Sequence, residues 1–94
     1  MIPNFEYNKK GDVYKCLDLD SIIRTNLIPN NIKEECKEKF NKNCYFNFNG
    51  VTKIGKLIGI ELNLKLNELF YILSDLESKD KYYITCIDTT LKRL

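Results

Sequence analysis

Apolar and polar residues alternate most regularly between Ile58 and Leu66. Every second residue of this segment is apolar, and the residues between them include Glu61, Asn63 and Lys65. A period of two is typical of a strand with one buried side and one solvent-facing side. The pattern therefore predicts a central strand from which Glu61, Asn63 and Lys65 face outward.

Three other segments show the same alternation: residues 13–19, 43–48 and 81–87. Each is short and contains β-branched or aromatic residues, as strands commonly do. We expect their inward-facing side chains to be Val13, Leu17, Leu19, Cys44, Phe46, Phe48, Tyr82, Ile84 and Cys86.

Asn49-Gly50 is a strong signal for a hairpin turn after the second of these strands. A two-residue turn there would place Phe46 on the face opposite Ile58 and Ile60, which would split the core. We therefore expect a longer loop, or a bulge near Gly55, to restore a single core.

A helix is predicted from Asn31 over about ten residues. Ile32, Cys36 and Phe40 recur at every fourth position, and Asn31 with Glu34 has the spacing of a capping box. This is the pattern of a solvated amphipathic helix with one buried face.

Residues 67–79 fit two interpretations. As a helix, the segment forms an apolar stripe through Leu69, Leu73 and Leu76, with Asn67 as its N-cap. As a strand over residues 68–73, it needs a following turn that contains no glycine. We favour the helix.

The resulting order is strand, helix, strand, strand, helix, strand. It predicts a ferredoxin-like βαββαβ sandwich of the α+β class, with a four-stranded antiparallel sheet and two helices on one face. If residues 67–79 are extended, the alternative is an SH3-like small β-barrel with a helical insertion. In either case we expect an N-terminal arm over residues 1–10 and a single α+β domain over residues 11–94.

Composition limits the class of protein. The chain has 94 residues, 44% hydrophobic and 30% charged, which suits one folded domain. Its net charge of +2 is neither a strongly acidic surface nor a strongly basic nucleic-acid footprint. Ala, His, Gln and Trp are absent while Asn, Lys and Ile abound. This bias is typical of A/T-rich genomes, such as those of some bacteria and phages.

The sequence also predicts a cytoplasmic protein that does not enter a membrane. No signal peptide opens the chain, and no run of about 18 apolar residues occurs. The four cysteines, Cys16, Cys36, Cys44 and Cys86, are widely spaced in apolar surroundings. We expect reduced core residues rather than disulfides or a zinc site.

Enzymatic chemistry has little support in the sequence. Histidine is absent, and no nucleophile motif or phosphate-binding glycine loop occurs. We therefore expect a protein that is not an enzyme and has no cofactor or metal. A cysteine- or carboxylate-dependent enzyme would need a pocket that gathers several of Cys16, Asp18, Asp20 and Asp88.

The favoured hypothesis is an interaction protein that binds and inhibits or regulates a protein or nucleoprotein partner. A phage or mobile-element inhibitor of a host defence complex, such as an anti-CRISPR protein acting on a CRISPR effector, is one concrete form. Exposed tyrosines suit such interfaces. The candidate partner-binding residues are Tyr14, Tyr45, Glu61, Asn63, Lys65 and Tyr83. Sheet edges would also allow a homodimer through strand addition.

The alternative is an RNA- or single-stranded-DNA-binding domain that uses Tyr14 and Tyr83 with Lys15 and Lys65. Tyr14 occupies the second position of its strand, and in this respect and in topology the chain resembles the RNA-recognition motif. That resemblance implies base stacking on the open sheet face. The predicted third strand has no outward aromatic residue for this purpose.

Overall fold

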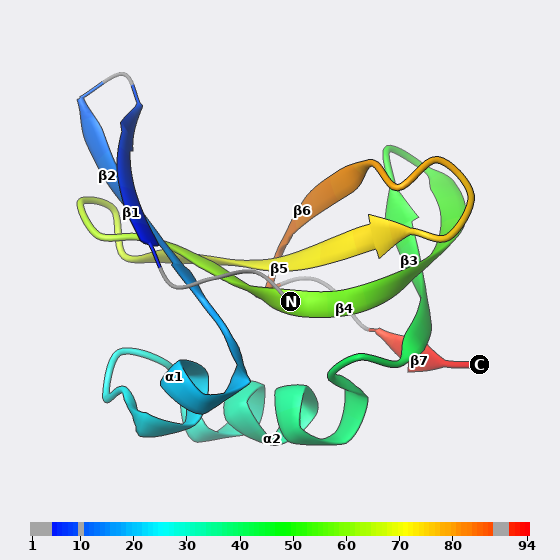
Figure 1. Cartoon of the computed structure of the whole chain (residues 1–94), viewed down its shortest axis with the longest axis horizontal. Coiled ribbons are helices and arrows are strands. Elements are labelled where there is room, and N and C mark those ends of the chain that lie inside the picture. Colours follow the sequence, from blue (N-terminus) through cyan, green and yellow to red (C-terminus); the bar gives the residue numbers. More distant parts are fainter. Residues whose placement is uncertain (1–4, 10, 88–90) are drawn as a thin grey trace.

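One long strand organises the fold. The computed structural model describes residues 5–9, 11–87 and 91–94. Strand β4 (Val51–Asn63) runs through its centre, and β5 (Glu68–Asp75) pairs along one edge (Figure 1). Along the other edge, β3 (Asn43–Phe48) pairs with the first part of β4 and β2 (Asp12–Leu17) pairs with its last part.

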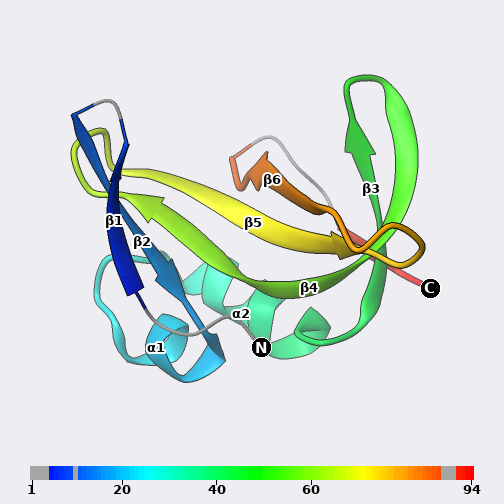
Figure 2. The same cartoon turned by 45° about the horizontal axis from the view of Figure 1, so that its top comes forward.

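Within the described ranges, the remaining strands extend this antiparallel sheet to seven strands. β1 (Phe5–Lys9) pairs with β2, β6 (Lys81–Thr85) pairs with β5, and the short β7 (Lys92–Arg93) pairs with β3. Helices α1 (Leu19–Arg24) and α2 (Asn30–Lys39) connect β2 to β3 and lie together on one side of the sheet (Figures 1 and 2). None of the helices in the described ranges has the length and apolar character needed to cross a membrane.

The predicted ferredoxin-like sandwich is therefore wrong. Its second helix would lie between the third and fourth strands, where the structure has β5 instead. The SH3-like alternative, which assumed that this segment is extended, does not describe the sheet either. The sheet has seven strands, and β6 does not pair with β7 within the described residues.

β5 was misassigned because it buries side chains on both faces. Leu69, Tyr71 and Leu73 join the main core, while Ile72 packs beside Cys16 on the other face. A strand buried on both sides has a continuous apolar run that periodicity cannot distinguish from a helix.

The turn after β5 forms without glycine. The Asp75 side chain accepts hydrogen bonds from the backbone N–H groups of Glu77 and Ser78, at 2.8 and 3.1 Å. Lys79 takes a positive φ of 65°. An Asx-type turn with one left-handed residue thus replaces the glycine that we expected a hairpin to need.

The Asn49-Gly50 turn and a bulge in β4 together keep one core. The turn has two residues, both at positive φ, so the longer loop is not formed. The pairing of β4 with β5 shifts register between Leu57 and Gly59, a few residues beyond the position near Gly55 where we expected a bulge. This shift lets Leu57 and Ile60 point into the same core as Phe46.

β4 ends at Asn63, so the alternating pattern continues past the strand. Leu64 and Leu66 are exposed in the turn to β5. The Asn63 side-chain oxygen accepts hydrogen bonds from the N–H groups of Lys65 and Leu66, at 3.0 and 3.1 Å. Asn67, expected as a helix N-cap, instead takes a φ of 57° at the end of this turn.

Helix α2 and the cysteines largely match their predictions. Ile32, Cys36 and Phe40 are buried against the sheet, as the four-residue spacing indicates. The helix nevertheless begins at Asn30 with Pro29 as its N-cap, so the capping box is not formed. All four cysteines are free and buried.

Candidate partner-binding face

The candidate site lies on the face of the sheet opposite Leu57 and Ile60, which we call the second face. Asn43, Lys56, Ser74 and Lys81 are successive cross-strand neighbours on β3, β4, β5 and β6. Side chains that are opposite each other in a ladder share a face. These four residues therefore form one row across four strands.

Two further rows continue the second face toward β2. Ile72 pairs with Tyr83 in the next row, and Glu61 lies between Cys16 and Phe70 in the row after it. Ile72, Cys16 and the half-buried Ile58 form a small apolar cluster separate from the main core. The second face is thus basic at one end and partly buried toward the other.

The structure places five of the six predicted partner-binding residues on the second face. They are spread from Tyr45 on β3 to Tyr14 on β2, with Tyr83 on the edge strand β6. Lys65 lies in the β4–β5 turn, and its Nζ atom is 3.6 Å from an oxygen of Asp12. They do not form one compact patch.

The expectation that Glu61 and Asn63 face solvent is wrong. Their exposed fractions are 6% and 3%. Asn63 uses its oxygen to form the β4–β5 turn, and its Nδ2 atom donates to Asp12 at 3.4 Å. Alternation assigned both residues to the correct face but could not show that this part of the face is covered.

Cys16 and Glu61 form a buried polar pair. The Cys16 thiol donates to Glu61 Oε2 at a sulfur–oxygen distance of 3.7 Å. Burial, followed by the charge of Glu61, raises the pKa of Cys16 to about 11. Burial is also the main reason that the pKa of Tyr83 is raised, and Glu61 and Cys16 add to it.

Burial also raises the pKa of the other three thiols. Burial raises the pKa of Cys36 and of Cys86 to about 12, and burial also raises the pKa of Cys44. Because the thiolate is the nucleophile, these groups are unreactive at neutral pH.

The residues of the cysteine–carboxylate hypothesis are not gathered in one pocket. Asp18 caps α1, its side chain accepting a hydrogen bond from Ser21 N–H at 3.0 Å. Asp18 and Asp20 border a hollow beside Phe40 that Cys16 does not line. Asp88 lies outside the described residues. Within the described part of the chain, no group of three or more metal-ligating side chains forms.

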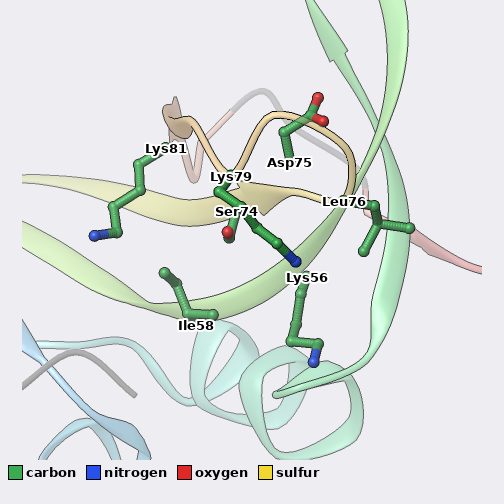
Figure 3. A pocket seen from close by; sticks show the side chains of 7 residues that line it. All are labelled: Lys56, Ile58, Ser74, Asp75, Leu76, Lys79 and Lys81. Atoms are coloured by element: carbon green, nitrogen blue, oxygen red, sulfur yellow. The ribbon is translucent and has the colours of Figure 1, made fainter.

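A basic groove occupies the Lys81 end of the second face. A hollow of about 240 Å³ between β4 and the β5–β6 turn is lined by Lys56, Lys79 and Lys81 (Figure 3). A second hollow of about 440 Å³ shares Lys56 and Leu76 with the first and adds Lys42 and Arg93. We call these two adjoining hollows the lysine groove.

The sequence did not reveal the lysine groove because it depends on the β5–β6 turn. Lys79 belonged to a predicted helix, and Lys56 and Lys81 are distant in sequence. Only the pairing of β4, β5 and β6 makes Lys56 and Lys81 neighbours of Ser74. The single available signal was the excess of lysines near these strands.

The structure does not bring together the tyrosines and lysines that the nucleic-acid alternative would use. Lys15 lines a hollow beside Arg24 and Leu27, next to α1, rather than the second face. Tyr14 and Tyr83 lie on β2 and β6, which are separated by β4 and β5.

No family model, curated protein or solved structure matches this chain. Functional proposals therefore depend on the geometry of the chain itself.

Proposed function

We propose that the protein is a non-enzymatic binding protein that attaches to a protein or nucleoprotein partner through β6. One observation supports this most strongly: β6 is an edge strand with exposed apolar side chains. Among the described residues it pairs only with β5, Tyr83 is 44% exposed, and Ile87 just beyond the strand is 80% exposed.

An edge strand of this kind has the features of a docking site. Its outer N–H and C=O groups can pair with a strand of the partner, and the tyrosine supplies a rigid contact surface. Such a partner would cover Tyr83 and Ile87, which otherwise expose apolar surface to water. A second copy of the chain could dock in the same way, and the homodimer stays a prediction.

The specific form that we propose is a stoichiometric inhibitor acting in the cytoplasm. Small size and an amino-acid composition typical of A/T-rich genomes are consistent with a phage or mobile-element origin. A host defence complex such as a CRISPR effector is then a candidate partner.

Affinity capture from nuclease-treated lysate of the cells that encode the protein tests this proposal. The wild type should retain one protein or protein complex in near-stoichiometric amount. The double variant Tyr83→Ser/Ile87→Ser should retain at least about tenfold less, since such anchor residues carry much of the binding energy.

Tyr45→Ser/Val51→Ser is the matched control, because these side chains are 41% and 55% exposed on other strands. It should retain the partner as the wild type does. Recovery of nucleic acid alone, or equal losses in both double variants, would contradict the proposal.

A further inference from the structure

We propose that the lysine groove binds the sugar–phosphate backbone of a single-stranded nucleic acid. This site goes beyond the docking of β6, since it uses different residues and a different chemistry.

The charge of the groove is concentrated and unbalanced. Lys42, Lys56, Lys79, Lys81 and Arg93 line its two hollows, in a chain whose net charge is only +2. All five residues are exposed. None of them forms an ion pair with any residue in the described part of the chain.

Among the described residues, Asp75 supplies the carboxylate side chain that lines the groove, and this carboxylate is bound to the backbone of the β5–β6 turn. Asp75 accepts hydrogen bonds from Glu77 and Ser78 N–H, and these bonds hold its pKa below the usual value. Its carboxylate points away from the side chains of Lys79 and Lys56 (Figure 3). With five cationic side chains and one carboxylate side chain among its described lining residues, the groove keeps an excess of positive charge that an anion can meet.

The spacing of the cations favours several linked negative charges over one. Lys56 and Lys81 are two strands apart, which places their backbones about 10 Å from each other at 4.7–4.9 Å per strand. Lys42 and Arg93 lie in the second hollow, beyond Lys56. A lone phosphate cannot contact both ends, whereas successive phosphates of one strand can.

Other groups in the groove suit a nucleic acid better than an acidic peptide. Ser74 and Asn43 provide neutral polar contacts of the kind that phosphates and sugars use. The side-chain oxygen of Asn43 is buried and has no hydrogen-bond partner among the described residues. The NH₂ group of the same amide is a donor of the kind that pairs with a phosphate or sugar oxygen. Ile58 and Leu76 offer apolar contacts for sugars between the charges.

Fluorescence anisotropy with labelled single-stranded oligonucleotides of about twelve nucleotides tests this site. The triple variant Lys56→Gln/Lys79→Gln/Lys81→Gln should bind at least about tenfold more weakly than the wild type near 50 mM salt. Each lost phosphate contact removes about 0.7 from the slope of log affinity against log salt, so this slope should become shallower by about 2. The single variant Lys56→Gln should change it by about 0.7.

Lys15→Gln/Lys33→Gln/Lys37→Gln makes the same change in net charge away from the groove. It should bind within about twofold of the wild type, and circular dichroism should show both triple variants folded. Equal weakening in both triple variants would overturn the site. Equally tight binding of poly-glutamate, or tighter binding of a duplex of the same length, would overturn the identity of the ligand. Because Tyr83 and Ile87 are unchanged in all these variants, the outcome is independent of partner capture through β6.

Discussion

Gly59 shows how a single residue permits the close approach of two strands. A Cβ atom at this position would lie 2.8 Å from the backbone oxygen of Leu17 on β2. Real Cβ atoms do not approach a backbone oxygen so closely, and neither backbone can move without disturbing the pairing of Leu17 with Ile60. The structure thus shows that Gly59 is needed for the close packing of β4 against β2.

We therefore expect Gly59→Ala to lower the free energy of unfolding by about 1–3 kcal/mol, the usual cost of overpacking. Urea denaturation measures this change. Thr52→Ala, at an exposed position of the same strand, should stay within about 0.5 kcal/mol of the wild type. A Gly59→Ala variant as stable as Thr52→Ala would show that β2 does not pack against this glycine.

Because the pKa values of the buried thiols are raised, we expect the folded protein to lose stability in alkaline solution. Their pKa values in the folded protein, about 11 for Cys16 and about 12 for Cys36 and Cys86, exceed the value of about 8.5 in an unfolded chain. Above pH about 9 the unfolded state loses thiol protons that the folded state keeps, so unfolding becomes more favourable as pH rises.

The free energy of unfolding under reducing conditions should therefore fall by about 1 kcal/mol per thiol for each pH unit between about pH 9 and 10. Denaturation at a series of pH values measures it. Cys36→Ala should be less stable throughout but decline less steeply with pH. An identical slope in the variant would mean that Cys36 is not protonated in the folded state over this range.

For single residues, the alternating pattern predicted the face of the sheet on which a side chain lies better than it predicted whether that side chain is exposed to solvent. Tyr45, Tyr83 and Ile87 are exposed as expected, and Ile84 and Cys86 are buried as expected. Glu61 and Asn63 are on the predicted face but buried. Whether a polar side chain meets water depends on neighbouring strands, and a single-strand pattern contains no information about them.

Among the elements, β4 contains a bulge that lets the apolar side chains before and after it point into the same core. Phe46 shares a face with odd-numbered residues of β4 up to Leu57, whereas Ile60 and Leu62 are even-numbered. The extra residue between Leu57 and Gly59 changes the phase once. The conflict between a two-residue turn and a single core was visible in the sequence, but whether a longer loop or a bulge resolves it, and at which position, was not.

Deletion of Ile58 should therefore abolish cooperative folding, because it would turn either Phe46 or Ile60 out of the core. Thermal unfolding followed by circular dichroism measures this loss. Deletion of Glu77, which is exposed in the β5–β6 turn, serves as a control and should leave a cooperative transition. A cooperative transition near the wild-type temperature after deletion of Ile58 would contradict the role of the bulge.

Elements with apolar residues on one face only were predictable, and β5, which is apolar on both faces, was not. α2 and the Asn49-Gly50 hairpin follow directly from spacing and turn chemistry. β5 was assigned as a helix because both of its faces are apolar and its turn uses Asp75 and Lys79 instead of glycine. The lysine groove depends on that turn, so it could not be predicted either.

At the scale of the whole molecule, the helices and the proposed binding surfaces lie on different sides of the sheet. α1 and α2 cover the core side of the sheet, whereas the lysine groove and Tyr83 belong to the second face. Lys81 and Tyr83 are two residues apart on β6. A nucleoprotein partner could therefore contact β6 with its protein and the groove with its nucleic acid.

Site-specific photo-crosslinking in the cells that encode the protein tests this account most directly. A photoreactive amino acid would replace Tyr83 on β6 or, as the comparison, Leu27, which is 51% exposed between α1 and α2. We predict one major protein adduct from position 83 and none from position 27. An adduct from position 27 with none from position 83 would contradict the claim that the partner binds through β6.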